Sequence, residues 1–221
     1  MSNERRRLWG RVCLWAGIIG AVQGVVLAAW PAQVASDRWS YPFDVTGHVV
    51  AQVSFFVQHL GLVAGLVALC SLPVATASPP TRWGLWAGTA GMALLAVQEL
   101  VAIAPARDST TSDLAELVGG LYTIPLMLIG VGLLAGGVGL ARRCQPTSPA
   151  ALQWLPAALG LWVFVPLLPS LFAPFVFARI SIGLWMLLFA ALGWGLTRAP
   201  EPAWRPASSA ERAPVRSPAM S

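Results

Sequence analysis

A small set of ionisable and amide side chains lies inside long apolar stretches of this sequence, and their residue types could do chemistry. The set comprises His48, Gln52, His59, Glu99, Glu116 and Arg179. A charged side chain inside a membrane span costs free energy unless a partner satisfies it. We therefore treat these residues as a candidate site for a proton, a small cation or a polar ligand.

The same residues also fit a structural interpretation, in which they satisfy one another inside the protein. Arg179 would then neutralise Glu99 or Glu116, or extend its side chain to the lipid headgroups. His59 would be a neutral histidine bonded to a neighbouring helix. The two interpretations differ in whether these side chains surround an open cavity or are closed into bonds with Arg179.

Helical phase predicts the faces on which the two glutamates lie. At about 100° per residue, Glu99 continues a stripe of small residues made of Gly84, Gly88 and Gly91. Glycine stripes let helices approach closely, so we expect Glu99 to face the bundle and not lipid. Glu116 falls on a small-residue face in the same way, and we expect it to face inward too.

The stretch that contains both histidines has polar or small residues on two opposite sides. The two stripes are Ser54, Gln58, Gly61, Gly65 and Ala68 on one side and His48, Gln52 and His59 on the other. A helix of this kind should have neighbours on both sides. We therefore expect it to lie centrally in the bundle.

Several chemistries lack the residues that they need. The sequence has no lysine, which excludes Schiff bases to retinal or pyridoxal phosphate. Its only histidines, His48 and His59, are about 16 Å apart along one helix and cannot ligate opposite faces of one haem within the chain, so a haem would need His59 with a partner subunit or a non-histidine ligand. We expect no cofactor and no metal ion. Protease, hydrolase and Walker motifs are also absent, which favours a non-enzymatic function.

The stretches that position these residues are predicted membrane spans. With 57% hydrophobic and 10% charged residues, the chain lacks the polar surface of a soluble globule. Apolar runs of about 20 residues predict an all-α, polytopic transmembrane bundle of about six spans. The expected spans are residues 8–29, 49–72, 83–104, 114–140, 152–172 and 174–197, all within one transmembrane domain over residues 1–198.

The arginines predict the orientation of the bundle, because arginine near a span end is retained in the cytoplasm. Most of them fall on one side: Arg5, Arg6, Arg7, Arg11, Arg82, Arg142, Arg143 and Arg198. Both termini are therefore expected to be cytoplasmic, with residues 199–221 as a disordered cytoplasmic tail. Most of the candidate site residues then lie in the extracytoplasmic half, with His59 close to the midplane.

An external loop, residues 37–44, is rich in aromatic and charged side chains. We interpret it as an interfacial anchor of the Trp/Tyr belt in preference to a lid over a ligand. Its Tyr41, Pro42 and Phe43 lead into the helix that carries His59 and then Gly61. This arrangement resembles small six-span integral membrane proteins of high-GC bacteria. The resemblance implies a multi-pass protein of the bacterial plasma membrane and no particular chemistry.

These features predict a transporter-like or sensor-like membrane protein with a polar site in the extracytoplasmic half. One alternative is a structural or accessory subunit whose glycine stripes, Gly20–Gly24, Gly61–Gly65 and Gly132–Gly136, dock a partner in a homo- or hetero-oligomer. Another is an intramembrane enzyme that uses His59 with a glutamate as acid and base. The expected partners are the lipid bilayer and such an oligomer. Nucleic acid is not expected, because the net charge of +5 is not gathered in a groove.

Overall fold

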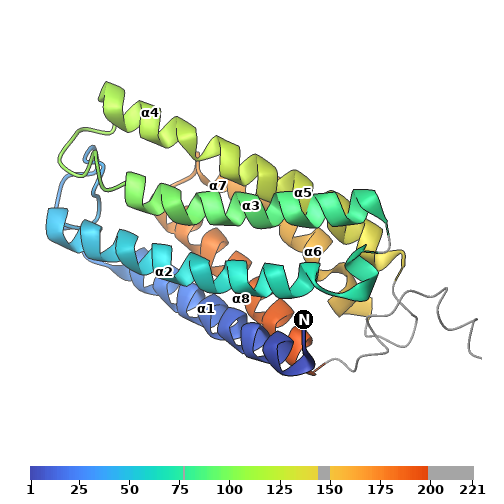
Figure 1. The fold of residues 1–221 in the computed structure, drawn as a ribbon. Helices are drawn as coiled ribbons and strands as arrows, with labels where there is room; N and C mark the ends of the chain where they lie inside the picture. The colour runs from blue at the N-terminus through green and yellow to red at the C-terminus, as the bar shows by residue number, and fades with distance from the viewer. Residues whose placement is uncertain (77, 144–149, 199–221) are drawn as a thin grey trace, which may run out of the picture.

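The computed structural model describes residues 1–76, 78–143 and 150–198, which form a bundle of helices (Figure 1). The α-helices are α1 (Asn3–Ala29), α2 (Val45–Cys70), α3 (Pro79–Val101), α4 (Asp113–Leu121), α5 (Thr123–Ala141), α6 (Ala150–Trp162), α7 (Leu168–Ser170) and α8 (Phe175–Arg198). A 3₁₀-helix, η1 (Pro73–Thr76), and a π-helix, η2 (Val163–Leu167), complete the helical elements of this part of the chain. The predicted tail, residues 199–221, lies outside the described residues.

In the described part of the chain, six helical segments are long and apolar enough to cross a membrane, which confirms the predicted number of spans. They are Asn3–Ala29, Val45–Cys70, Pro79–Val101, Asp113–Ala141, Gln153–Ser170 and Phe175–Arg198. Helices α1 and α2 begin several residues before the predicted spans. Polar caps account for this difference, because Ser2 accepts a hydrogen bond from the Arg5 amide and Asp44 accepts one from the Gly47 amide. The predicted spans were taken from apolar runs, which do not include such polar first turns.

Prolines coincide with interruptions of two of these segments. The fourth is divided at Tyr122 into α4 and α5, and Pro125 has no amide hydrogen for the carbonyl of Leu121. The fifth contains the π-turn η2, where Pro166 cannot bond to the carbonyl of Trp162. The first interruption matters for the site, because it sets the position of the Tyr122 side chain.

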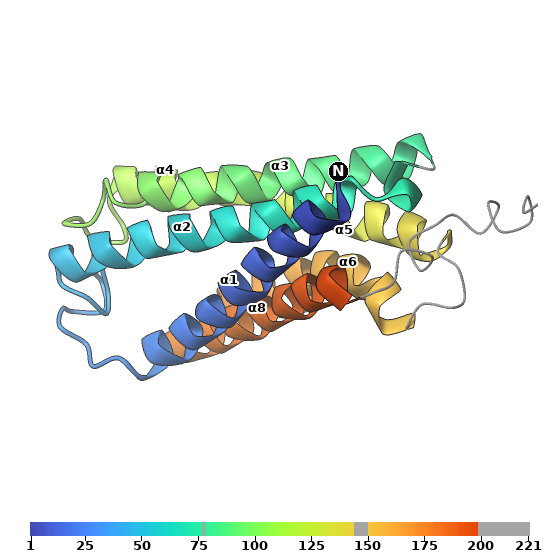
Figure 2. The ribbon, with the colours of Figure 1, turned by 60° about the horizontal axis from the view of Figure 1, so that its bottom comes forward.

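Consecutive spans pack against each other and close into a ring (Figures 1 and 2). Helix α2 packs on α1 and α3, α5 on α3 and α6, and α8 on α6 and α1. Helix α2 also touches α8 across the ring. Helix α2 has neighbours on both sides, as its two polar stripes predicted, but it lies in the ring and not at its centre, because Val50, Val53 and Val57 are exposed.

The bundle has two distinct ends. The N-terminus and the last turn of α8 lie at one of them, which we call the terminal end (Figure 1). The connections 30–44 and 102–112 lie at the opposite end, which we call the loop end. Figure 2 shows that α1 and α2 approach each other near the terminal end and diverge toward the loop end, where the 30–44 connection joins them.

Glycine allows the closest helix contacts in the ring. A Cβ atom added at Gly17 of α1 would lie 2.5 Å from the backbone nitrogen of Ala190 in α8. One added at Gly132 of α5 would lie 2.5 Å from the backbone nitrogen of Gly88 in α3. The stripe that was predicted on α3 therefore packs directly on α5, with the backbones in contact.

The glycine pairs expected to dock a partner are instead covered by helices of this chain. Gly20–Gly24, Gly61–Gly65 and Gly132–Gly136 pack on α8, α1 and α3, respectively. A glycine pair lets any helix approach, so the sequence did not distinguish a neighbour in the same chain from a partner. With these faces occupied, the pairs no longer support the interpretation as an accessory subunit.

Candidate ligand-binding site

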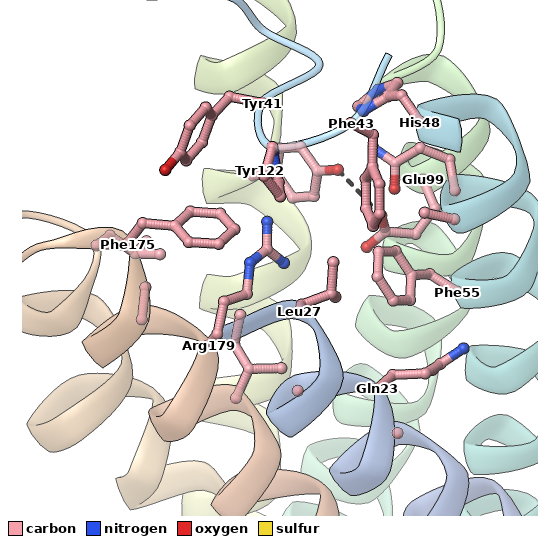
Figure 3. A pocket seen from close by; sticks show the side chains of 18 of the residues that line it. Gln23, Leu27, Tyr41, Phe43, His48, Phe55, Glu99, Tyr122, Phe175 and Arg179 are labelled. Carbon is pink, nitrogen blue, oxygen red and sulfur yellow. Dashed lines mark hydrogen bonds between the residues drawn. The ribbon is translucent and has the colours of Figure 1, made fainter. Parts of the chain in front are cut away.

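A cavity of about 520 Å³ lies between the helices in the half of the bundle that carries the loop end (Figure 3). Side chains of α1, α2, α3 and α8 line it, together with Tyr122 and part of the 30–44 connection. Its volume is within the range of about 300–1,000 Å³ that is typical of small-molecule sites. The ring of helices therefore encloses a space large enough for a ligand.

Most of the site residues chosen from the sequence converge on this cavity. His48, Gln52 and His59 line it from α2, Glu99 from α3 and Arg179 from α8. All of them are buried except Arg179, which is partly buried. Helical phase and depth indicated these positions one helix at a time, and the closed ring brings them together.

Glu116 is the exception, and its expected inward orientation is wrong. Its side chain is exposed in the first turn of α4 and does not line the cavity. The expectation used the face that it shares with Gly120, but no atom lies within 4 Å of a Cβ added at Gly120. That face of α4 is therefore unpacked. An acidic residue in the first turn of a helix also interacts favourably with the helix dipole.

Glu99 is 8% exposed, and its carboxylate accepts a hydrogen bond from the phenol of Tyr122. The distance from the Tyr122 hydroxyl to Oε2 of Glu99 is 3.3 Å. Gln52 lies against the same phenol from α2. Tyr122 was not among the residues chosen from the sequence. The only feature that could have indicated it is its position close to a proline inside an apolar span.

Arg179 extends from α8 into the cavity, where its guanidinium lies 4.7 Å from the centre of the Phe175 ring (Figure 3). Among the described residues, no hydrogen bond or ion pair joins Arg179 to Glu99 or to Glu116. The sequence placed Arg179 and Glu99 at similar depths, but depth does not give the distance across the bundle. Arg179 and Glu99 therefore interact electrostatically across the cavity, without the direct bond that the structural interpretation expected.

The two histidines bond to backbone carbonyls. His48 donates from Nε2 to the carbonyl of Ala102 at 3.1 Å, and His59 donates from Nδ1 to the carbonyl of Phe55 at 2.7 Å. The His59 bond is made within α2 and not to the neighbouring helix that we expected. In the part of the chain that the structure describes, no group of three His, Cys, Asp or Glu side chains is arranged to hold a metal ion.

Two buried amide oxygens at the cavity have no hydrogen-bond partner among the described residues. They are Oε1 of Gln52, which is 7% exposed, and Oε1 of Gln23. The nitrogen of Gln23 is occupied, because it donates to the Ser54 hydroxyl at 2.6 Å. An unsatisfied buried acceptor costs about 1–3 kcal/mol. A ligand with N–H or O–H donors could satisfy both oxygens.

The 30–44 connection forms part of the cavity wall, which differs from our interpretation of this loop as an interfacial anchor. Trp39, Tyr41 and Phe43 all line the cavity. The indole of Trp39 donates to the carbonyl of Ala102 at 2.9 Å, and the Tyr41 ring packs edge-on against Phe175 at 5.3 Å. These contacts hold the connection between the helix ends.

No protein-family model, curated protein or solved structure matches this chain. The function must therefore be argued from the site. The site combines a guanidinium, a carboxylate and unpartnered amide oxygens around one space with aromatic walls.

Proposed function

We propose that this chain is a multi-pass protein of a bacterial plasma membrane that binds a small polar ligand from the extracytoplasmic side, as a transporter or a sensor does. The observation that carries the proposal is that Glu99 and Arg179 line one cavity without a direct bond between them. Charged side chains inside a span are costly and commonly mark a ligand or ion pathway. A ligand that interacts with both side chains would offset that cost.

The arginine distribution supports an extracytoplasmic position for the loop end. Arg6, Arg82 and Arg142 lie at the terminal end of the bundle, whereas Arg38 and Arg107 lie in the two connections of the loop end. The positive-inside rule then favours cytoplasmic termini, with the cavity in the extracytoplasmic half.

Ligand binding has more support than the enzymatic alternative. His59 and Glu99 line the same cavity, but among the described residues no hydrogen bond joins them. The His59 Nδ1 atom is instead bonded to its own helix. A general acid and a general base must each reach the substrate, and in His59 only Nε2 is left to do so.

Cysteine labelling in intact cells tests the orientation. Thr110 is exposed and lines the cavity at the loop end, whereas Arg82 is exposed near the terminal end. In a Cys144→Ser background, we expect a membrane-impermeant maleimide to label Thr110→Cys in intact cells and Arg82→Cys only after lysis. Labelling in the opposite order would contradict an extracytoplasmic site.

Native mass spectrometry of the purified full-length protein tests ligand binding itself. Ala51 lines the cavity, and the neighbouring Val50 is 64% exposed and does not line it. We expect the wild type and Val50→Trp to retain a small molecule that Ala51→Trp loses. If the three proteins carry the same adducts, or none, the cavity is not a ligand site.

A further inference from the structure

One wall of the cavity carries a guanidinium. The guanidinium of Arg179 carries five N–H donors and no acceptor. Among the described residues, its side chain packs on the Phe175 ring, which covers one face of the guanidinium, and it interacts electrostatically with Glu99 without a hydrogen bond. The donor edge is therefore available to a group in the cavity (Figure 3). Carboxylate and phosphate are the groups that match the geometry of this edge.

The opposite wall supplies acceptors. Among the described residues, the Glu99 carboxylate receives a single hydrogen bond, from Tyr122, which leaves other lone pairs for a ligand. Oε1 of Gln52 is buried without a partner among the described residues, and Gln52 and Glu99 both lie against Tyr122. Clustered acceptors with one negative charge suit an ammonium group, which has N–H donors and no acceptor.

The space between the two walls is lined mainly by aromatic and aliphatic side chains. Phe43 and Phe55 lie beside Glu99, and Leu27 lies between that side and Arg179 (Figure 3). Aromatic faces also attract ammonium groups. The cavity therefore suits a compact molecule whose two charged groups are joined by an apolar body.

We propose, on the premise that the cavity is a ligand site, that its ligand is a zwitterion. The anionic group of the ligand, a carboxylate or a phosphate, pairs with Arg179. Its ammonium group binds to Glu99 and to the amide oxygen of Gln52. A molecule that carries only the anionic group, or only the ammonium group, would leave one of the two walls without a partner of opposite charge.

A zwitterion of this kind could be a free solute or the headgroup of a lipid. A second groove of about 800 Å³ lies between α1 and α2, and Gln58 lines both this groove and the cavity. Exposed Trp15, Ile19 and Val57 line the groove, so it faces the lipid side of the bundle. The experiment must therefore compare the two sources.

The experiment measures binding to the purified full-length protein by calorimetry and by thermal shift. The soluble probes are leucine and phosphoethanolamine, and the lipid probe is lysophosphatidylethanolamine. The half-molecule probes are 4-methylpentanoate, which is leucine without its amine, and isoamylamine, which is leucine without its carboxylate. We expect at least one zwitterion to bind at least about tenfold more tightly than either half-molecule. The preferred probe then identifies a free solute or a lipid headgroup as the source.

Charge-neutral variants assign the two walls. Glu99→Gln should abolish the preference for leucine over 4-methylpentanoate, and Arg179→Gln should abolish the preference for leucine over isoamylamine. If a different zwitterion is preferred, its own half-molecules replace these two. A variant that had lost its fold would bind none of the probes. Loss of only one of the two preferences therefore indicates a local effect on one wall. The matched controls are Glu116→Gln and Arg107→Gln, which are exposed and do not line the cavity, and both should behave as the wild type.

Two results would overturn the zwitterion proposal. One is binding of a half-molecule as tight as that of every zwitterion, and the other is no binding by any zwitterion in the set. Neither result decides whether the cavity is a ligand site. That question is answered separately by the adduct that Ala51→Trp should lose and by the labelling of Thr110→Cys.

Discussion

The two halves of the bundle, the closed terminal half and the open loop half, use the same helices but differ in what fills the space between them. Toward the terminal end, Gly17 and Gly132 bring α1 onto α8 and α5 onto α3 with their backbones in contact. Toward the loop end, large side chains such as Phe55, Tyr122 and Arg179 stand between the helices and surround a cavity. Glycine joins α1 to α8 in both halves, since Gly24 meets the backbone of Arg179 and Gly183, but large polar and aromatic side chains surround open space in the loop half.

This difference shows how a small membrane protein can combine a rigid scaffold with a polar site. In the terminal half, association rests on van der Waals contact between closely packed backbones, which tolerates no added volume. In the loop half, the polar groups hold one another through single bonds, such as Tyr122 to Glu99, and leave some acceptors unpaired. The closed half therefore provides the stability that the open half lacks.

The largest expected effect comes from adding a methyl group to the closed half. Gly132→Ala places a Cβ 2.5 Å from the backbone of α3, so the two helices must separate. We expect a loss of about 3 kcal/mol or more in the free energy of unfolding, measured by titration with sodium dodecyl sulfate. Gly120→Ala is the control, because its Cβ would meet no atom within 4 Å, and it should gain about 0.5–1 kcal/mol. Equal effects at both positions would contradict the comparison.

Replacing each of two alanines of α2 by leucine compares the closed half and the open half of the bundle within one helix. Ala68 is fully buried in the closed half, whereas Ala51 is partly exposed and lines the cavity. We expect Ala68→Leu to cost about 1–3 kcal/mol, because it overpacks the core. Ala51→Leu has room in the cavity and should cost less than 1 kcal/mol, about the level of a tolerated substitution. Thermal unfolding in detergent measures both, and a larger loss at Ala51 would mean that the cavity is not open space.

The smallest effect concerns the boundary between the cavity and the groove. The hydroxyl of Ser54 in α2 accepts a hydrogen bond of 2.6 Å from Gln23 in α1. Hydrogen bonds between membrane helices contribute about 0.6 kcal/mol on average, so Ser54→Ala should reduce stability by about that amount. The same titration as for Gly132→Ala measures it. A loss of several kcal/mol would show that this contact, and not the glycine packing, holds α1 to α2.

The candidate site could be predicted in part. Glu99 was placed correctly, because the period of the α-helix relates it to Gly84 and Gly88 on the same face. Glu116 was misplaced by the same method, because its turn of α4 extends where no other helix packs. The method gives the face of one helix and cannot show whether another helix covers it.

Contacts between segments that are distant in the chain could not be predicted from the sequence. Tyr122 reaches Glu99 only because the break between α4 and α5 lies opposite that turn of α3. Phe43 reaches the cavity only because its loop is held by contacts such as that of Trp39 with Ala102. Nothing in the composition of the loop distinguishes this arrangement from an interfacial anchor.

The sequence by itself determined that this chain forms six helices long and apolar enough to span a membrane, with a few polar residues on their small-residue faces. Hydrophobic length and helical period are local properties, so the order of residues is enough to establish them. Only the tertiary structure decided that Glu99 and Arg179 share a cavity and are not bonded to each other. The separation between two helices depends on side chains along their whole length, and here glycine brings neighbouring helices together while aromatic and polar residues surround open space toward the loop end.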